Sequence, residues 1–138
     1  MFFAMPLLLP ALLMSANFEA PPAASAPAAA PAGSEKLCGW VVNPTPGNYW
    51  LVDRQTRWNT GWLISSQGGY QARGMDEMPD MTTRGQVKTN GNYGYSCGCL
   101  QARLDRRNRQ VTRIYSAEPA PLAQCRRDRR LPQPPRRP

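Results

Sequence analysis

The stretch from Tyr93 to Leu104, YGYSCGCLQARL, is the longest strand candidate in this chain of 138 residues, and the rest of the fold is expected to form around it. Asn90-Gly91, a dipeptide typical of tight hairpin turns, comes just before it. Val111–Ser116 is expected to pair with it as an antiparallel neighbour. Cys97 and Cys99 lie two residues apart in this strand, so their side chains point to the same face.

Shorter strand candidates precede this stretch. Leu37–Val42 alternates with the period of two that is typical of a strand, and it ends at Asn43–Asn48, a turn with two prolines and a glycine. Tyr49–Asp53 and Gly61–Ser65 are short apolar segments of the kind that pair as a hairpin. Tyr70–Gln86 shows no period and is expected to be an irregular loop.

One helix is expected near the C-terminus. Pro121 is suited to its first turn, Leu122 and Cys125 fall on one face, and arginines follow at the end where cations suit the helix dipole. The sequence therefore predicts a mainly β domain. We expect a small antiparallel sheet or partly open barrel of five to six strands, with one C-terminal helix, linked by disulfides.

The four cysteines, Cys38, Cys97, Cys99 and Cys125, are expected to form two disulfides. A bridge between Cys97 and Cys99 is disfavoured by geometry, because residues two apart in a strand lie too far from each other. We favour Cys38–Cys97 with Cys99–Cys125, and the pairing of Cys38 with Cys99 remains open. A zinc site is disfavoured, because zinc ribbons need paired C-x-x-C knuckles.

The N-terminal part resembles an export signal followed by a tether. The first 14 residues are almost wholly apolar, and Ala24-Ser25-Ala26 has the small-x-small form of a signal peptidase site, with Met14-Ser15-Ala16 as an earlier option. We expect residues 1–26 to be a signal peptide, 27–36 an Ala/Pro-rich tether, 37–131 the folded domain, and 132–138 a basic, disordered tail rich in Pro and Arg.

The absence of histidine from the sequence excludes a Ser-His-Asp triad, a Cys-His pair and histidine-ligated metals. Asp76, Glu77 and Asp80 are candidate carboxylates for hydrolysis of a cell-wall polymer, but catalysis needs a defined separation and a raised pKa. A solvated loop is the favoured interpretation. We expect no catalytic residue, no metal and no cofactor.

A recognition surface is predicted around the rigid turn and its flanking aromatic residues. It comprises Trp40, Asn43, Pro44, Pro46, Gly47, Asn48 and Trp50.

The positive charge is concentrated at the C-terminus, where residues 126–138 contribute +5 of the total +8. The cations of this basic tail are Arg126, Arg127, Arg129, Arg130, Arg136 and Arg137. In an exported protein they would meet anionic lipid or lipopolysaccharide, and no nucleic-acid motif accompanies them.

Several motifs resemble the bacterial domain of unknown function family numbered 4087. They are CGW at 38–40, NPTPGN at 43–48, QGG at 67–69, KTNGNYGY at 88–95 and CGC at 97–99, followed by Cys125. The resemblance covers about residues 37–131 and implies a small exported or envelope protein, mostly of Gram-negative bacteria. It implies no catalytic residue.

Together these features predict a periplasmic or secreted, non-enzymatic domain that binds an envelope protein or polysaccharide, with an inhibitor as one form of such a module. A cell-wall hydrolase using the Asp76, Glu77 and Asp80 loop is the alternative, and a structural or stress protein without a dedicated ligand is another.

Export has a direct test. We expect protein recovered from the cell envelope to lack residues 1–26, because the apolar run and the Ala-Ser-Ala site direct cleavage after Ala26. Intact-mass analysis of the recovered protein checks this expectation. An intact Met1 on protein found in the cytoplasm would contradict it.

Overall fold

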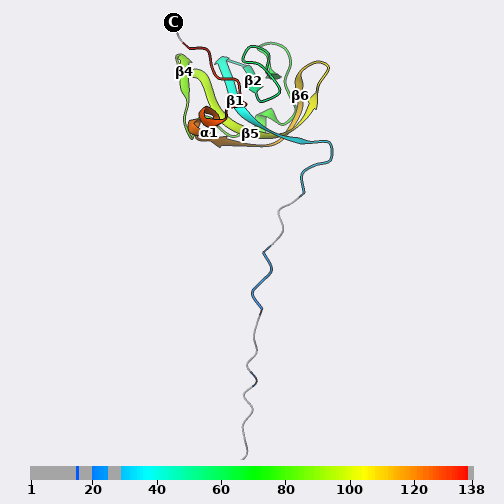
Figure 1. The fold of residues 1–138 in the computed structure, drawn as a ribbon. Coiled ribbons are helices and arrows are strands. Elements are labelled where there is room, and N and C mark those ends of the chain that lie inside the picture. Colours follow the sequence, from blue (N-terminus) through cyan, green and yellow to red (C-terminus); the bar gives the residue numbers. More distant parts are fainter. Residues whose placement is uncertain (1–14, 16–19, 25–28, 137–138) are drawn as a thin grey trace, which may run out of the picture.

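The computed structural model describes residue 15 and residues 20–24 and 29–136. This part of the chain contains six strands, a single 3-10 turn at Met75–Glu77 and one α-helix (Figure 1). The elements are β1 (Glu35–Thr45), β2 (Asn48–Val52), β3 (Trp62–Ser65), β4 (Val87–Asn90), β5 (Tyr93–Asp105), β6 (Gln110–Ala120) and α1 (Leu122–Arg127).

The strands form one sheet in the order β1-β2-β3-β6-β5-β4, and β1 also pairs with β5. The five strands β1, β2, β3, β6 and β5 therefore form a ring of pairings, with β4 attached to β5 (Figure 1). The predicted mainly β fold with a C-terminal helix is confirmed. The sheet is mixed rather than wholly antiparallel, because β3 meets β6 in parallel where Leu63 lies opposite Gln110.

The strand β4 was missing from the sequence prediction. Its four residues are half-buried or exposed, so they carry no alternating apolar pattern. The signal that could have found it is the hairpin turn itself, since Gly91 has a φ of 57° and Asn90 pairs with Tyr93. A hairpin turn before β5 requires a strand on its other side.

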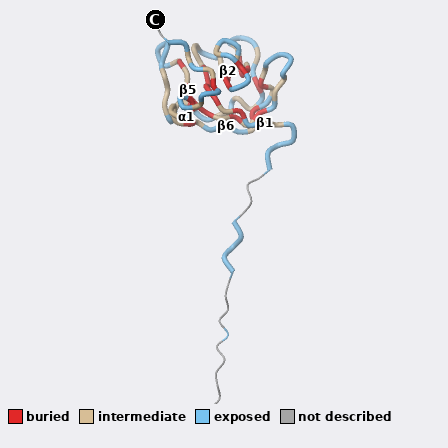
Figure 2. Tube along the Cα trace, viewed as in Figure 1, coloured by how far each residue is buried: buried red, intermediate tan, exposed pale blue. Residues whose placement is uncertain are grey.

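The buried residues are concentrated in the β-domain and not in the described part of the segment before it (Figure 2). Their side chains form two clusters on opposite faces of β1 and β5. The ring cluster draws apolar residues from all five strands of the ring and includes Leu37, Val41, Leu51, Ile64, Leu100 and Val111. The helix cluster includes Trp40, Val42, Val52, Cys97, Ala120, Cys125 and Leu131. Alternation along β1 places successive residues in different clusters.

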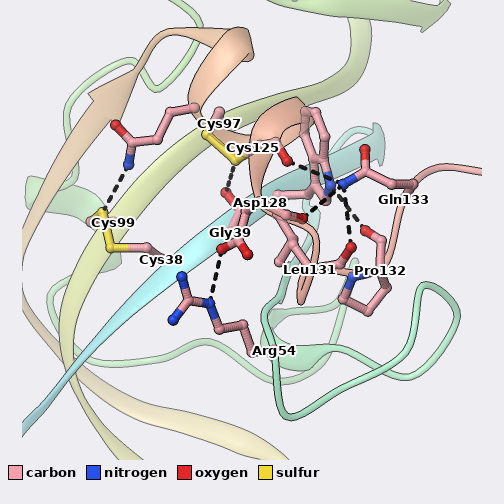
Figure 3. The surroundings of a disulfide bond; sticks show 12 residues. Cys38, Gly39, Arg54, Cys97, Cys99, Cys125, Asp128, Leu131, Pro132 and Gln133 are labelled. Atoms are coloured by element: carbon pink, nitrogen blue, oxygen red, sulfur yellow. Dashed lines mark hydrogen bonds and ion pairs between the residues drawn. A yellow bond between two sulfur atoms is a disulfide. The ribbon is translucent and has the colours of Figure 1, made fainter.

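The four cysteines form two disulfides, Cys38–Cys99 and Cys97–Cys125 (Figure 3). Two disulfides are confirmed, but the favoured pairing of Cys38 with Cys97 and of Cys99 with Cys125 is wrong. The register of β1 against β5 explains this result, because Cys38 lies directly opposite Cys99. Cys97 lies opposite Trp40 and is left to bridge to α1.

The contacts of the domain extend past the predicted boundaries at residues 37 and 131. Before β1, Arg103 donates a hydrogen bond of 2.8 Å to the Ala32 carbonyl. After α1, the Gln133 amide donates to the carbonyls of Cys125 at 3.1 Å and Leu131 at 3.2 Å (Figure 3). Residues 32–36 and 132–133 are therefore part of the packed structure.

The Cys97–Cys125 disulfide should be required for the docking of α1. Its two cysteines are 28 residues apart, and we expect the change of both to Ala to lower the free energy of unfolding by roughly 2 to 4 kcal/mol. In a domain of this size, that loss corresponds to a fall in Tm of about 10 °C or more. Thermal denaturation followed by circular dichroism measures it.

A matched control changes Cys38 and Cys99 to Ala, since this second bridge joins strands that are already paired by backbone hydrogen bonds. Amide exchange separates the two variants. We expect faster exchange in α1 only when Cys97 and Cys125 are removed. Unchanged exchange in α1 of that variant would show that the helix docks without its bridge.

Candidate functional site

The turn at 43–48 joins β1 to β2 and is held by side-chain hydrogen bonds. In the orientation that satisfies its neighbours, the Asn43 amide donates to the carbonyls of Asn48 at 2.9 Å and Thr45 at 2.7 Å. Its oxygen accepts a hydrogen bond of 2.7 Å from the Tyr49 hydroxyl. Gly47 has a φ of 73°, which favours glycine at this position. These hydrogen bonds hold the turn in one conformation, so the Asn43 side chain stabilises the fold.

Trp40 does not belong to a recognition surface, so its inclusion there is wrong. It is completely buried in the helix cluster, and its Nε1 donates a hydrogen bond of 3.1 Å to the Pro132 carbonyl. The sequence prediction treated the chain after Leu131 as a disordered tail, and this segment is what covers Trp40. Pro46 and Gly47 are exposed, while Pro44, Asn48 and Trp50 are half-buried.

An aromatic groove of about 220 Å³ lies on the side of β1 that carries Trp40. Trp58 and Tyr95 meet edge to face with ring centroids 5.1 Å apart. Both rings also pack edge-on against Trp40, at 6.3 Å for Trp58 and 5.3 Å for Tyr95. The groove is lined by Val42, Pro44, Trp50, Trp58, Thr89, Gly94, Tyr95, Pro134 and Pro135.

Of the predicted recognition residues, the structure places Pro44 and Trp50 in this groove. Sequence reasoning missed Trp58, Tyr95 and the two prolines. Tyr95 carried a usable signal, because it lies two residues before Cys97 and so shares its face of β5. Trp58 lies in an irregular segment, and its position had no sequence signal.

A second space, the methionine-loop cavity, lies on the opposite side of β1 and has a volume of about 270 Å³. Val41, Asn43 and Tyr49 form one wall, and Met75 and residues 78–82 of the irregular loop form another. Residues 94–96 of β5 also line this cavity. Burial raises the pKa of the Tyr49 hydroxyl, and the charges of Asp80 and Tyr93 raise it further. The hydroxyl therefore stays protonated and available to donate to Asn43.

The three candidate carboxylates do not converge on one cavity. Asp80 lines the methionine-loop cavity, and Asp76 lines a different depression beside Gln67 and Gly68. All three are exposed. Hydrogen bonds from the Thr82 hydroxyl and backbone N–H hold the pKa of Asp80 below its ordinary value, which is the opposite of what a general acid needs.

The basic tail is accessible where the structure describes it. Arg126, Arg127, Arg129, Arg130 and Arg136 are exposed, and Arg137 lies outside the described residues. Arg126 and Arg127 occupy the last turn of α1, where positive charge is favourable. Asp128 is paired with Arg54 at 2.8 Å, which ties this end of the helix to the loop after β2 (Figure 3).

These features define a small β domain with two disulfides, an aromatic groove and a separate cavity. The chain belongs to the family described as "Protein of unknown function (DUF4087)", whose model matches residues 32–132. The match confirms the resemblance drawn from the sequence motifs. A search of the curated proteins finds no match, and a search of the solved structures finds none.

Two further observations concern membranes and metals. Within residues 20–24 and 29–136, no helix has the length and apolar character needed to cross a bilayer. The same described segments hold no group of three His, Cys, Asp or Glu side chains placed to bind a metal ion. These four residue types do not include methionine, whose thioether sulfur can also bind a metal ion.

Replacement of Trp40 by Phe should destabilise the protein more than replacement of Trp62. Both indoles are buried, but Trp62 Nε1 has no hydrogen-bond partner in the described structure, whereas Trp40 Nε1 bonds to Pro132. We expect Trp40→Phe to cost at least about 1 kcal/mol more than Trp62→Phe, because only Trp40 loses a hydrogen bond.

Chemical denaturation of the two variants measures this difference. Amide exchange at Leu131 and Gln133 should also rise in Trp40→Phe and remain as in the wild type in Trp62→Phe. Equal destabilisation of the two variants would show that the bond to Pro132 contributes nothing.

Proposed function

We propose that this protein is an exported, non-enzymatic binding module that recognises another envelope protein through its aromatic groove. The observation that carries the proposal is the grouping of Trp50, Trp58 and Tyr95 around an open groove that is already bordered by Pro134 and Pro135. Rigid rings of this kind supply a large contact area with little loss of conformational entropy.

The groove fits an extended, proline-containing segment of the partner. Proline-rich chains adopt a polyproline helix before they bind, and they dock in grooves lined by aromatic side chains. The protein's own Pro134 and Pro135 lie at the wall of the groove. Proline rings are therefore already accommodated next to these aromatic residues, and a partner segment would extend or replace that contact.

Export is supported by the apolar leader and by the two disulfides, since disulfides persist mainly in oxidising compartments. A role without catalysis is supported by the lack of histidine and by the separation of the three carboxylates. The exposed Arg136 directly follows Pro135, which lines the groove, and adds positive charge to this part of the chain. In an envelope, this charge would favour contact with anionic lipid or lipopolysaccharide.

The proposal predicts that the mature protein binds a synthetic decaproline peptide. Thr89 is an exposed residue of β4 that lines the groove, and the larger side chain of Thr89→Arg should obstruct it. We expect Thr89→Arg to weaken peptide binding by about tenfold or more, a loss of roughly 1.4 kcal/mol. The fluorescence of Trp50 and Trp58 reports the titration.

The matched control is Ser116→Arg, which adds the same charge at an exposed position of β6 away from the groove. A Gly-Ser peptide of equal length controls for non-specific contact. Binding of decaproline that is equal in the two Arg variants would contradict the groove as its site. Binding of peptidoglycan fragments, and not of decaproline, would contradict a peptide partner.

A further inference from the structure

Three methionines are concentrated in the irregular loop, in the sequence MDEMPDM from Met75 to Met81. The other three methionines of the chain lie within its first 14 residues, so every methionine after the leader belongs to this one loop. Met75, Met78 and Met81 are spaced three residues apart. Met75 begins the 3-10 turn, and Met78 follows the last residue of that turn in an extended conformation.

The structure brings these three side chains to the same space, because all three line the methionine-loop cavity. Met81 is only 4% exposed, and Met75 and Met78 are half-buried against the ring cluster. The methyl group of Met81 packs against Gly98, where a Cβ atom would collide with it. The glycine between Cys97 and Cys99 thus makes room for the innermost methionine.

Packing accounts for part of this arrangement, because Met81 belongs to the ring cluster and Met75 and Met78 pack against it. Methionine is a flexible residue that fills irregular gaps, yet these three side chains also border a space that is open to solvent. Here a cavity of about 270 Å³ remains beside the three side chains. Each side chain has three rotatable bonds, so the sulfur atoms can adjust around an occupant of that space.

We propose that Met75, Met78 and Met81 bind one Cu(I) ion through their thioether sulfur atoms in this cavity. Thioethers are soft ligands that select Cu(I) over hard cations such as Mg²⁺ and Ca²⁺. The other soft or borderline donors are not available, since the four cysteines are bridged and the sequence has no histidine. The proposal departs from the prediction, made from the sequence, of no metal.

The charge around the cavity favours a cation. Thioethers are neutral, so a bound Cu(I) keeps its positive charge and gains from a nearby anion. The carboxylate of Asp80 lies at the cavity wall. Asp76 and Glu77 lie between the first two methionines. In a protein with a net charge of +8, this loop is locally acidic.

The cavity and the aromatic groove share Gly94 and Tyr95 in their linings, but Val41 and Asn43 line only the cavity whereas Val42 and Pro44 line only the groove. Adjacent residues of a strand point to opposite faces, so β1 lies between the two spaces. Binding of Cu(I) therefore does not depend on the function proposed for the groove, and either test can fail alone.

The experiment titrates the mature, disulfide-bonded protein anaerobically against the Cu(I)–bicinchoninate complex, with ascorbate as a reductant that leaves disulfides intact. We expect the protein to withdraw one Cu(I) per chain, and Ag(I), which has no accessible redox change, to compete for it. The variant Met75→Leu/Met78→Leu/Met81→Leu should lose affinity by about tenfold or more, while its fold persists because Leu and Met have similar volumes.

Arg84→Lys is the matched control in the same loop, because Arg84 is exposed and does not line the cavity, and this variant should bind Cu(I) with affinity within a few-fold of the wild type. X-ray absorption should show sulfur as the nearest neighbour of copper. In selenomethionine-labelled protein, the nearest neighbour should change to selenium, which distinguishes these residues from the disulfide sulfurs. Equal affinity of the triple Leu variant, or nitrogen and oxygen neighbours in place of sulfur, would overturn the proposal.

Discussion

The pairing of β1 with β5 is the constraint on which the rest of the structure depends. It runs without a register shift from Glu35 opposite Ala102 to Asn43 opposite Gly94, and it closes the ring of five strands. A shift by one residue would move every side chain of β1 to the other face. Cys38 would then no longer face Cys99, and the large indole of Trp40 would enter the ring in place of a smaller residue.

This register also assigns the two spaces of the molecule to the two faces of β1. Trp40 and Val42 lie on the face that receives α1 and the C-terminal segment, and the aromatic groove forms where that cover ends. Val41 and Asn43 lie on the face of the ring cluster, where the irregular loop covers the end of the ring and leaves the cavity. One strand thus positions both candidate sites.

Features encoded by local sequence were predicted well, and features that depend on distant contacts were not. The five predicted strands, the 43–48 turn and the helix follow from periods and turn residues within a few positions of each other. The disulfide pairing depends on the register of two strands about 60 residues apart, which no local pattern fixes. The burial of Trp40 depends on Pro132, and the importance of the methionines depends on the cavity that gathers them.

The two disulfides also explain how so small a domain keeps open space. A domain of about 100 residues has a marginal core, because a small domain leaves much of its chain exposed. The Cys38–Cys99 bridge restrains the central strand pair, and the Cys97–Cys125 bridge restrains α1, whose Cys125 packs in the same cluster as Trp40. Both act largely on the unfolded chain, so they stabilise the fold without filling it. The groove and the cavity can therefore stay open in a protein whose core packing alone would give only a small free energy of unfolding.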